Sequence, residues 1–123
     1  MDRRGGCRCG KVRYTVSGEP LRTGLCHCTS CRKESGSLYT AYAVWPRSAF
    51  AMTGEAMEWQ GRSFCPICGS RLFALREDEA EIKIGSLDDA PNGLEPQYEL
   101  WTKRREAWLQ PVPGAGQYVE DRP

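Results

Sequence analysis

Two short stretches decide how this chain folds: Gly6-Cys7-Arg8-Cys9-Gly10 and Ser63-Phe64-Cys65-Pro66-Ile67-Cys68-Gly69. Each holds two cysteines separated by one or two residues, and each ends in Cys-Gly. Glycine readily adopts the positive φ that turns backbone amides back toward a thiolate. Two such pairs from distant parts of a chain can supply the four ligands of a structural zinc and tie those parts together. We therefore predict a closed zinc site at Cys7, Cys9, Cys65 and Cys68.

A third cluster, Cys26-His27-Cys28-Thr29-Ser30-Cys31, offers three thiolates. Three protein ligands leave one coordination position free, as in catalytic zinc sites. We therefore predict an open zinc site at Cys26, Cys28 and Cys31, with its degree of occupancy left open. His27 lies between two cysteines spaced for ligation, so we expect its side chain to point away from their metal as an ordinary, partly exposed histidine. Two alternatives stay open: His27 completes a structural site, or the cluster holds no permanent metal and works as free thiols of low pKa.

Zinc is the metal that these cysteines favour. The chain has seven cysteines, an odd number that disulfides alone cannot pair, and no leader peptide is recognisable at Met1. Reduced thiolates prefer Zn²⁺ to Mg²⁺ or Ca²⁺, with a small iron–sulfur cluster as the alternative. A redox role for Cys65 and Cys68 alone would leave Cys7 and Cys9 unexplained, and no βαβ pattern surrounds them.

Length and composition favour one mostly β domain. A chain of 123 residues with a net charge of +1 is long enough for a modest core and has no excess charge to attract a polyanion. We expect residues 1–123 to form a single domain, with a core over about 5–109 and a loosely packed tail over 111–123. No stretch approaches the roughly 20 apolar residues of a membrane span, so we expect a soluble, cytoplasmic protein without a membrane partner.

Period-two patterns dominate over helical ones. Val12, Tyr14 and Val16 alternate with polar residues and predict a strand, and the apolar run from Leu38 to Trp45 predicts a buried strand ending at Pro46. Further strands are predicted at Ala56–Gln60, Arg71–Arg76, Glu81–Ile84 and Gln97–Thr102. The only helical candidates are short, at Thr29–Ser35 and Pro46–Phe50.

The aromatic residues lie in the apolar phase of these segments, which favours core packing over base stacking. They include Trp45, Trp59, Trp101, Trp108, Tyr39 and Tyr42. We therefore expect no nucleic-acid partner. No phosphate-binding loop, dinucleotide fingerprint or nucleophile elbow is present either.

Four blocks of the sequence, taken in order, are Gly6-Cys7-Arg8-Cys9-Gly10-Lys11-Val12-Arg13-Tyr14, Cys26-His27-Cys28-Thr29-Ser30-Cys31-Arg32-Lys33, Ser63-Phe64-Cys65-Pro66-Ile67-Cys68-Gly69-Ser70-Arg71-Leu72-Phe73 and Ile84-Gly85-Ser86-Leu87-Asp88-Asp89. Their order and spacing resemble the glutathione-dependent formaldehyde-activating enzyme (GFA) family, also called the centromere protein V domain. The resemblance covers Gly5 to about Leu109.

This resemblance implies an Mss4-like, zinc-stapled β fold of short antiparallel strands with little helix. It implies a structural zinc on the four-cysteine set and a catalytic zinc on Cys26, Cys28 and Cys31, in agreement with the spacing. The implied reaction is that of a carbon–sulfur lyase of the S-hydroxymethylglutathione synthase type, joining glutathione and formaldehyde. In the late strand, relatives often carry a histidine just before an isoleucine-tryptophan pair. The corresponding residue here is Glu99, which precedes Leu100-Trp101, so no role of that histidine is carried over.

The chemistry can also be argued from the residues. A zinc with three thiolates favours a soft fourth ligand, and an incoming thiol would be deprotonated there and could attack a small aldehyde. Arg32 and Lys33, which follow the cluster directly, are candidates for binding the carboxylates of a glutathione-like thiol. Candidate proton donors or acceptors are Glu34, Tyr39, Asp88 and Glu99. The alternative function is a non-catalytic zinc module that binds glutathione or a protein partner.

Overall fold

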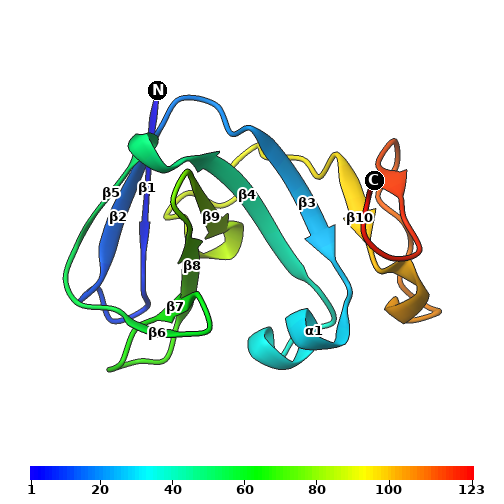
Figure 1. The fold of residues 1–123 in the computed structure, drawn as a ribbon, viewed down its shortest axis with the longest axis horizontal. Helices are drawn as coiled ribbons and strands as arrows, with labels where there is room; N and C mark the ends of the chain where they lie inside the picture. The colour runs from blue at the N-terminus through cyan, green and yellow to red at the C-terminus, as the bar shows by residue number, and fades with distance from the viewer. The chain divides into compact units, whose positions relative to one another are not determined.

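A computed structural model describes all residues from 1 to 123. Its contacts divide the chain into two compact units, each built from two separate stretches. Unit 1 comprises residues 1–22 and 43–93, and unit 2 comprises residues 23–42 and 94–123. Figure 1 traces the elements in chain order. No helix combines the length and the apolar character that crossing a bilayer requires.

Unit 1 begins with a three-stranded antiparallel sheet. Strand β2 (Arg13–Ser17) lies between β1 (Asp2–Gly6) and β5 (Phe50–Thr53). Val12, Tyr14 and Val16 are almost completely buried, as their alternation predicts. The Tyr14 ring stacks on Phe50 and meets Phe73 edge-on, with centroid distances of 5.9 and 5.8 Å. This aromatic cluster joins the sheet to the second group of strands in the same unit.

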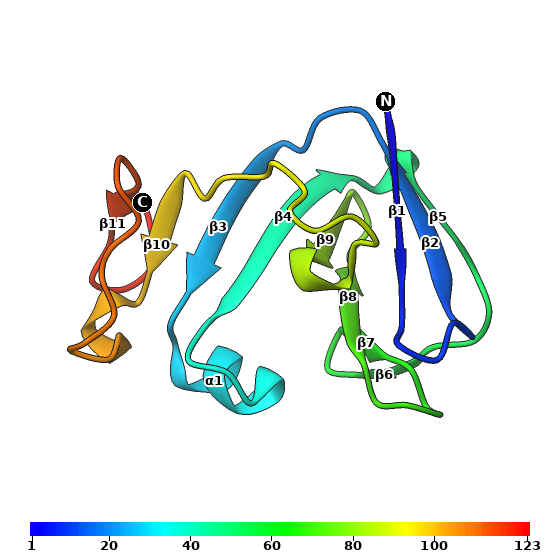
Figure 2. The same ribbon diagram turned by 180° about the vertical axis from the view of Figure 1, so that it is seen from behind.

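The second group of strands in unit 1 is an antiparallel run ordered β9-β8-β7-β6. Its members are β6 (Met57–Trp59), β7 (Arg62–Phe64), β8 (Arg71–Leu75) and β9 (Glu79–Lys83). Leu72, Phe73 and Ile82 supply buried apolar side chains. The turn between β7 and β8, visible in Figure 2, carries Cys65 and Cys68. Two short 3₁₀ turns, Arg47–Ala49 and Ile84–Ser86, complete the unit.

Unit 2 is organised around strand β10 (Tyr98–Leu100). β10 pairs in parallel with β3 (Arg22–Cys26) and with β11 (Gly116–Gln117). The expected fold of short antiparallel strands does not include these parallel pairs. Parallel pairing requires long connections, and the chain supplies them between β3, β10 and β11. A 3₁₀ turn, Thr102–Arg104, follows β10. Strand β4 (Thr40–Pro46) begins in unit 2 and ends in unit 1.

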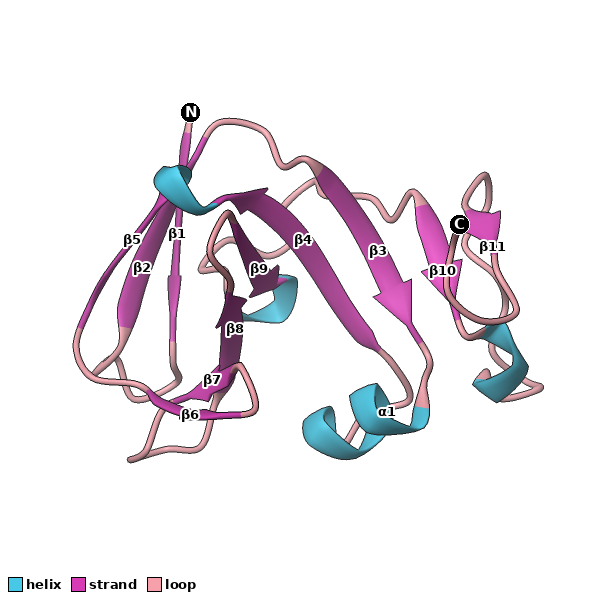
Figure 3. Cartoon of the chain, in the orientation of Figure 1, coloured by secondary structure: helices cyan, strands magenta, loops and turns pink.

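The one α-helix, α1 (Thr29–Ser35), has the predicted bounds (Figure 3). Cys28 is its N-cap residue, and Cys28 Sγ accepts a hydrogen bond from the Cys31 amide. Gly36 ends the helix in the left-handed conformation, with φ of 69°, which glycine adopts without steric cost. The mostly β fold with one short helix is confirmed, and its two cysteine clusters fit a zinc-stapled, Mss4-like architecture.

The segment after Pro111 contrasts with the loose tail expected from its composition. It contains β11, and the Tyr118 amide donates to the Glu99 carbonyl oxygen at 2.9 Å. The Trp101 amide donates to Glu120, and the Trp101 indole donates to Asp121. Hydrogen-bond partners contributed by β10 and by Trp101, the residue after it, therefore hold a segment whose own sequence lacks an apolar pattern.

The prediction that the aromatic residues pack in the core is wrong for two tryptophans. Trp59 is 63 % exposed and Trp108 is 69 % exposed. Trp59 lies in the outermost strand of its run, where its ring packs against the Arg62 guanidinium at 5.7 Å. Trp45, in contrast, is fully buried and donates its indole N–H to Gly18. An apolar position faces a core only if another layer covers it, which the local pattern cannot show.

Candidate metal centres

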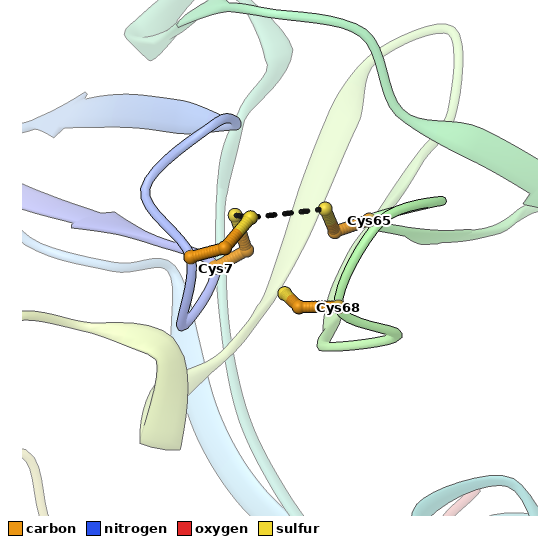
Figure 4. A group of neighbouring side chains, drawn as sticks. Cys7, Cys65 and Cys68 are labelled. Carbon is orange, nitrogen blue, oxygen red and sulfur yellow. Dashed lines mark hydrogen bonds between the residues drawn. The ribbon is translucent and has the colours of Figure 1, made fainter.

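The structure brings the four cysteines of unit 1 together from two turns. Cys7 and Cys9 lie between β1 and β2, and Cys65 and Cys68 lie between β7 and β8. All four sulfurs are within 4.8 Å of one another. The Cys7 and Cys9 sulfurs are 3.5 Å apart, and those of Cys9 and Cys65 are 3.7 Å apart. Figure 4 shows the side chains of Cys7, Cys65 and Cys68 turned toward a common centre.

The two turns also direct backbone N–H groups at the sulfurs. The Val12 amide donates to Cys7 Sγ at 3.2 Å, and the Ile67 amide donates to Cys65 Sγ at 3.4 Å. Gly10 and Gly69 have φ of 83° and 78°, the positive values that the Cys-Gly pairs predict. Such N–H donors orient metal-binding thiolates and offset their negative charge.

The pKa values in this cluster fit a cation site. Hydrogen bonds from the Ser70 hydroxyl and amide lower the pKa of Cys68 to about 5. The Lys11 amide acts to lower the pKa of Cys9, but desolvation and the neighbouring thiols prevail and raise it to about 11. Without a cation, the crowded sulfurs thus hold some of their protons. A divalent ion would relieve their mutual repulsion, and four sulfurs in this arrangement suit the tetrahedral preference of Zn²⁺.

Unit 2 holds the three-cysteine cluster. Cys26 ends β3, Cys28 caps α1, and Cys31 lies in the first turn of that helix. Their sulfurs are also within 4.8 Å of one another. Cys26 is buried, whereas Cys28 and Cys31 are partly exposed. Two of the three candidate ligands are therefore partly accessible to solvent.

Crowding and burial also keep two of these thiols, Cys26 and Cys28, protonated in the absence of a cation. The hydrogen bond with Cys31, together with burial, raises the pKa of Cys26 far above its ordinary value. Burial is the main cause of a raised pKa at Cys28. Three soft donors that cannot all ionise alone, but can do so around a divalent ion, fit zinc.

Comparison with known proteins identifies the family. The model of the family described as glutathione-dependent formaldehyde-activating enzyme matches residues 2–104. The chain belongs to the GFA family. Its sequence is 29 % identical over 85 residues to a protein of Emericella nidulans, an alignment covering 63 % of this chain and 43 % of that protein. It is 28 % identical over 105 residues to one of Penicillium rubens, covering 75 % of this chain and 55 % of that protein.

Both fungal relatives are provisionally named as glutathione-dependent formaldehyde-activating enzymes. The GFA-family chain described here spans about half the length of these curated relatives. Among solved structures, a Rhodobacter sphaeroides protein superposes with a TM-score of 0.55 at 18 % identity. The superposition covers 94 % of this chain and 98 % of that one, which shows a shared fold.

His27 corrects one expectation for this GFA-family chain. Its side chain is fully buried, not partly exposed. His27 Nε2 forms a hydrogen bond of 2.7 Å with Glu99 Oε1, and neither cysteine group includes His27 as a ligand. Glu99, at 1 % exposure, is buried as well. No local sequence pattern signals this pair, because its members are 72 positions apart.

Hydrogen bonds keep Glu99 ionised despite its burial. Desolvation acts to raise the pKa of this carboxyl, but hydrogen bonds from the Gln117 side chain, the Val112 amide and His27 outweigh it and lower the pKa below its ordinary value. The Val112 amide and Gln117 Nε2 both donate to Glu99 Oε2, at 2.7 and 2.9 Å. Glu99 is thus committed to protein donors.

The two predicted substrate-binding residues have different surroundings. Arg32 Nη2 contacts Glu106 Oε2 at 2.7 Å, and Arg32 Nη1 donates to the Arg104 carbonyl oxygen at 2.9 Å. To bind a substrate carboxylate, the Arg32 guanidinium would have to leave Glu106 or contact both carboxylates at once. Lys33, the next residue in α1, is exposed.

The predicted proton-transfer candidates do not all share the unit of the open cluster. Asp88 belongs to unit 1, where the Arg13 guanidinium lowers the pKa of its carboxyl through a hydrogen bond. Glu34 and Tyr39 are in unit 2, and the Tyr39 ring lies 5.4 Å from that of His27. The roles of these residues in proton transfer stay predictions.

Oxidation offers a test of the open cluster. In metal-poor protein purified in air, we expect a disulfide within Cys26, Cys28 and Cys31, because the three thiols are close and two are accessible. Mass mapping after alkylation would locate it, and zinc-loaded protein, which should stay reduced, is the control. Three reduced and unreactive thiols in protein without metal would contradict an accessible site.

Proposed function

We propose that this chain is a zinc-dependent, carbon–sulfur lyase-like enzyme that adds a glutathione-like thiol to formaldehyde or another small aldehyde. The supporting observation is the contrast between the two clusters: four sulfurs converge in one, whereas the other has three, two of them partly exposed. The family and the names of its fungal relatives agree with this reaction class.

In this proposal, Cys7, Cys9, Cys65 and Cys68 hold a structural zinc, and Cys26, Cys28 and Cys31 hold a catalytic one. Zn²⁺ bound at three thiolates would favour a soft fourth ligand and lower the pKa of an incoming thiol. Cys28 and Cys31 are partly exposed, and that thiol would approach the metal from their side. Lys33, and Arg32 through exchange with Glu106, attract its carboxylates.

The reaction balances without any oxidant. The thiolate sulfur attacks the carbonyl carbon, so that a carbon–sulfur bond forms and the carbonyl π bond breaks. The oxygen then takes up the proton that the thiol released, giving a hydroxymethyl thioether. Glu34 and Tyr39 are the residues of unit 2 that we propose for this proton transfer.

Turnover decides the proposal. Thiols add to formaldehyde unaided in water, so the rate of exchange between glutathione and its adduct has to be measured against the uncatalysed rate, for example by exchange NMR. We expect acceleration by protein with two zinc ions and none by Cys28→Ser protein that keeps one zinc. A wild type with two zinc ions that does not exceed the uncatalysed rate with any small aldehyde would refute the enzyme.

One observation favours the alternative, a non-catalytic zinc module that binds glutathione or a protein partner. Two of the four predicted acid-base residues are engaged elsewhere: Asp88 pairs with Arg13, and Glu99 pairs with His27. Binding of glutathione to the zinc-loaded protein without acceleration of exchange would support this module.

The ion pair between Arg32 and Glu106 predicts opposite effects on glutathione binding for substitutions of its two members. If Arg32 binds a glutathione carboxylate, Arg32→Ala should weaken glutathione binding by about 1 to 3 kcal/mol, the range for a charge-assisted contact. Glu106→Gln should strengthen binding severalfold, because it removes the carboxylate that competes for the same guanidinium. Calorimetry on zinc-loaded proteins measures both changes. Unchanged affinity in both variants would remove Arg32 from the site.

A further inference from the structure

Burial of the polar side chains of His27 and Glu99 in unit 2 carries a cost in free energy. Both side chains are buried to 1 % exposure or less, and His27 Nδ1 has no hydrogen-bond partner. Because an ionised carboxylate only accepts hydrogen bonds, Nε2 is the donor in the contact with Glu99. A buried pair of polar, ionisable side chains is often no more stabilising than well-packed apolar residues of similar volume. Stability alone therefore does not account for it.

The pair holds the middle of the metal-binding loop at two points. The His27 amide donates to the Leu100 carbonyl oxygen at 3.0 Å, and the His27 ring is bound by Glu99. Leu100 and Glu99 are neighbours in β10, which pairs in register with β3, so that Leu100 lies opposite Cys26. These two contacts, one at the backbone and one at the ring, restrict the rotation of His27. They thereby restrict the backbone from which the Cys26 and Cys28 side chains project.

The second oxygen of Glu99 is held by the C-terminal segment. Val112 and Gln117 donate to Oε2, and Arg105 Nη1 lies 3.6 Å from Oε1. All three residues come after residue 104, where the match to the family model ends. The groups that orient Glu99 are thus supplied by a part of this chain outside the family match.

We propose that the Glu99–His27 pair, oriented by residues 105–117, is a positioning device that presents Cys26 and Cys28 to one metal ion. Glu99 and His27 are positioning residues and touch neither metal nor substrate. The inference rests on the metal site of the proposed function. Outer hydrogen bonds that orient ligands commonly change metal affinity 10- to 100-fold when lost.

The experiment measures metal affinity, not turnover. Mild chelation empties the three-cysteine site while zinc stays in the closed site, and Co²⁺ is then titrated in, with thiolate-to-cobalt absorption as the readout. We expect Glu99→Gln to weaken Co²⁺ binding about tenfold or more and to alter the visible bands. Gln117→Ala, which removes an exposed residue that donates to Glu99, should weaken binding less but in the same direction.

Glu79→Gln is the matched control. It makes the same chemical change and breaks a two-point ion pair with Arg22 in unit 1, at 2.7 and 2.9 Å, so its Co²⁺ affinity should equal that of the wild type. Wild-type affinity and spectrum in both Glu99→Gln and Gln117→Ala would overturn the positioning role. If Glu99→Gln does not fold, Gln117→Ala decides alone. Failure of the wild type itself to bind a second metal ion would refute the proposed metal site, and this inference with it.

Discussion

Cys65→Ser is expected to unfold or aggregate the protein, whereas Cys28→Ser should leave a folded chain with one metal ion. Cys65 is fully buried, and with Cys68 it brings the β7–β8 turn against the turn that carries Cys7 and Cys9. Structural zinc sites of this kind supply about 10 to 16 kcal/mol of apparent binding free energy, which exceeds the net stability of most domains. Loss of one of four ligands therefore removes much of what holds unit 1 together.

Thermal unfolding and metal analysis on the two variants check this difference. We expect Cys28→Ser to bind close to one zinc per chain and to melt cooperatively. Mild chelation of the wild type should likewise remove one zinc while the fold persists, because the three-cysteine site lacks a fourth protein ligand. Equal destabilisation by Cys65→Ser and Cys28→Ser would argue against one closed and one open site.

Glu99→Ala is expected to lower the free energy of unfolding by about 3 to 5 kcal/mol, the range for breaking a buried pair by removing one partner. The substitution leaves His27 buried with no partner at either ring nitrogen. It also leaves Val112 and Gln117 without their acceptor. In a chain of this size the melting temperature should fall by about 10 °C or more.

The double variant His27→Leu with Glu99→Leu should recover much of that loss. It removes both buried polar groups together and refills the space with apolar atoms, while Gln117 is exposed and can bond to water. Denaturant unfolding of the wild type, the single variant and the double variant measures the recovery. If Glu99→Ala alone leaves stability unchanged, Glu99 is not a structural partner of His27.

Much of this protein could be predicted from local sequence. The bounds of α1, the buried alternation of Val12, Tyr14 and Val16, and the positive φ of Gly10 and Gly69 depend on residues within a few positions of one another. The grouping of cysteines into four and three also follows from their spacing, since cysteines one or two residues apart can bind the same metal ion. The family follows from the same blocks in the same order.

Only the tertiary structure decided the surroundings of these residues. It pairs His27 with Glu99 and Arg32 with Glu106, exposes Trp59, and aligns β10 parallel to β3. Each of these depends on which distant segment packs against which, and no periodicity within a segment encodes that partner. The sequence by itself determined which atoms can bind a metal; non-local packing determined how those atoms are oriented, because burial and hydrogen-bond partners are supplied by residues far away in the chain.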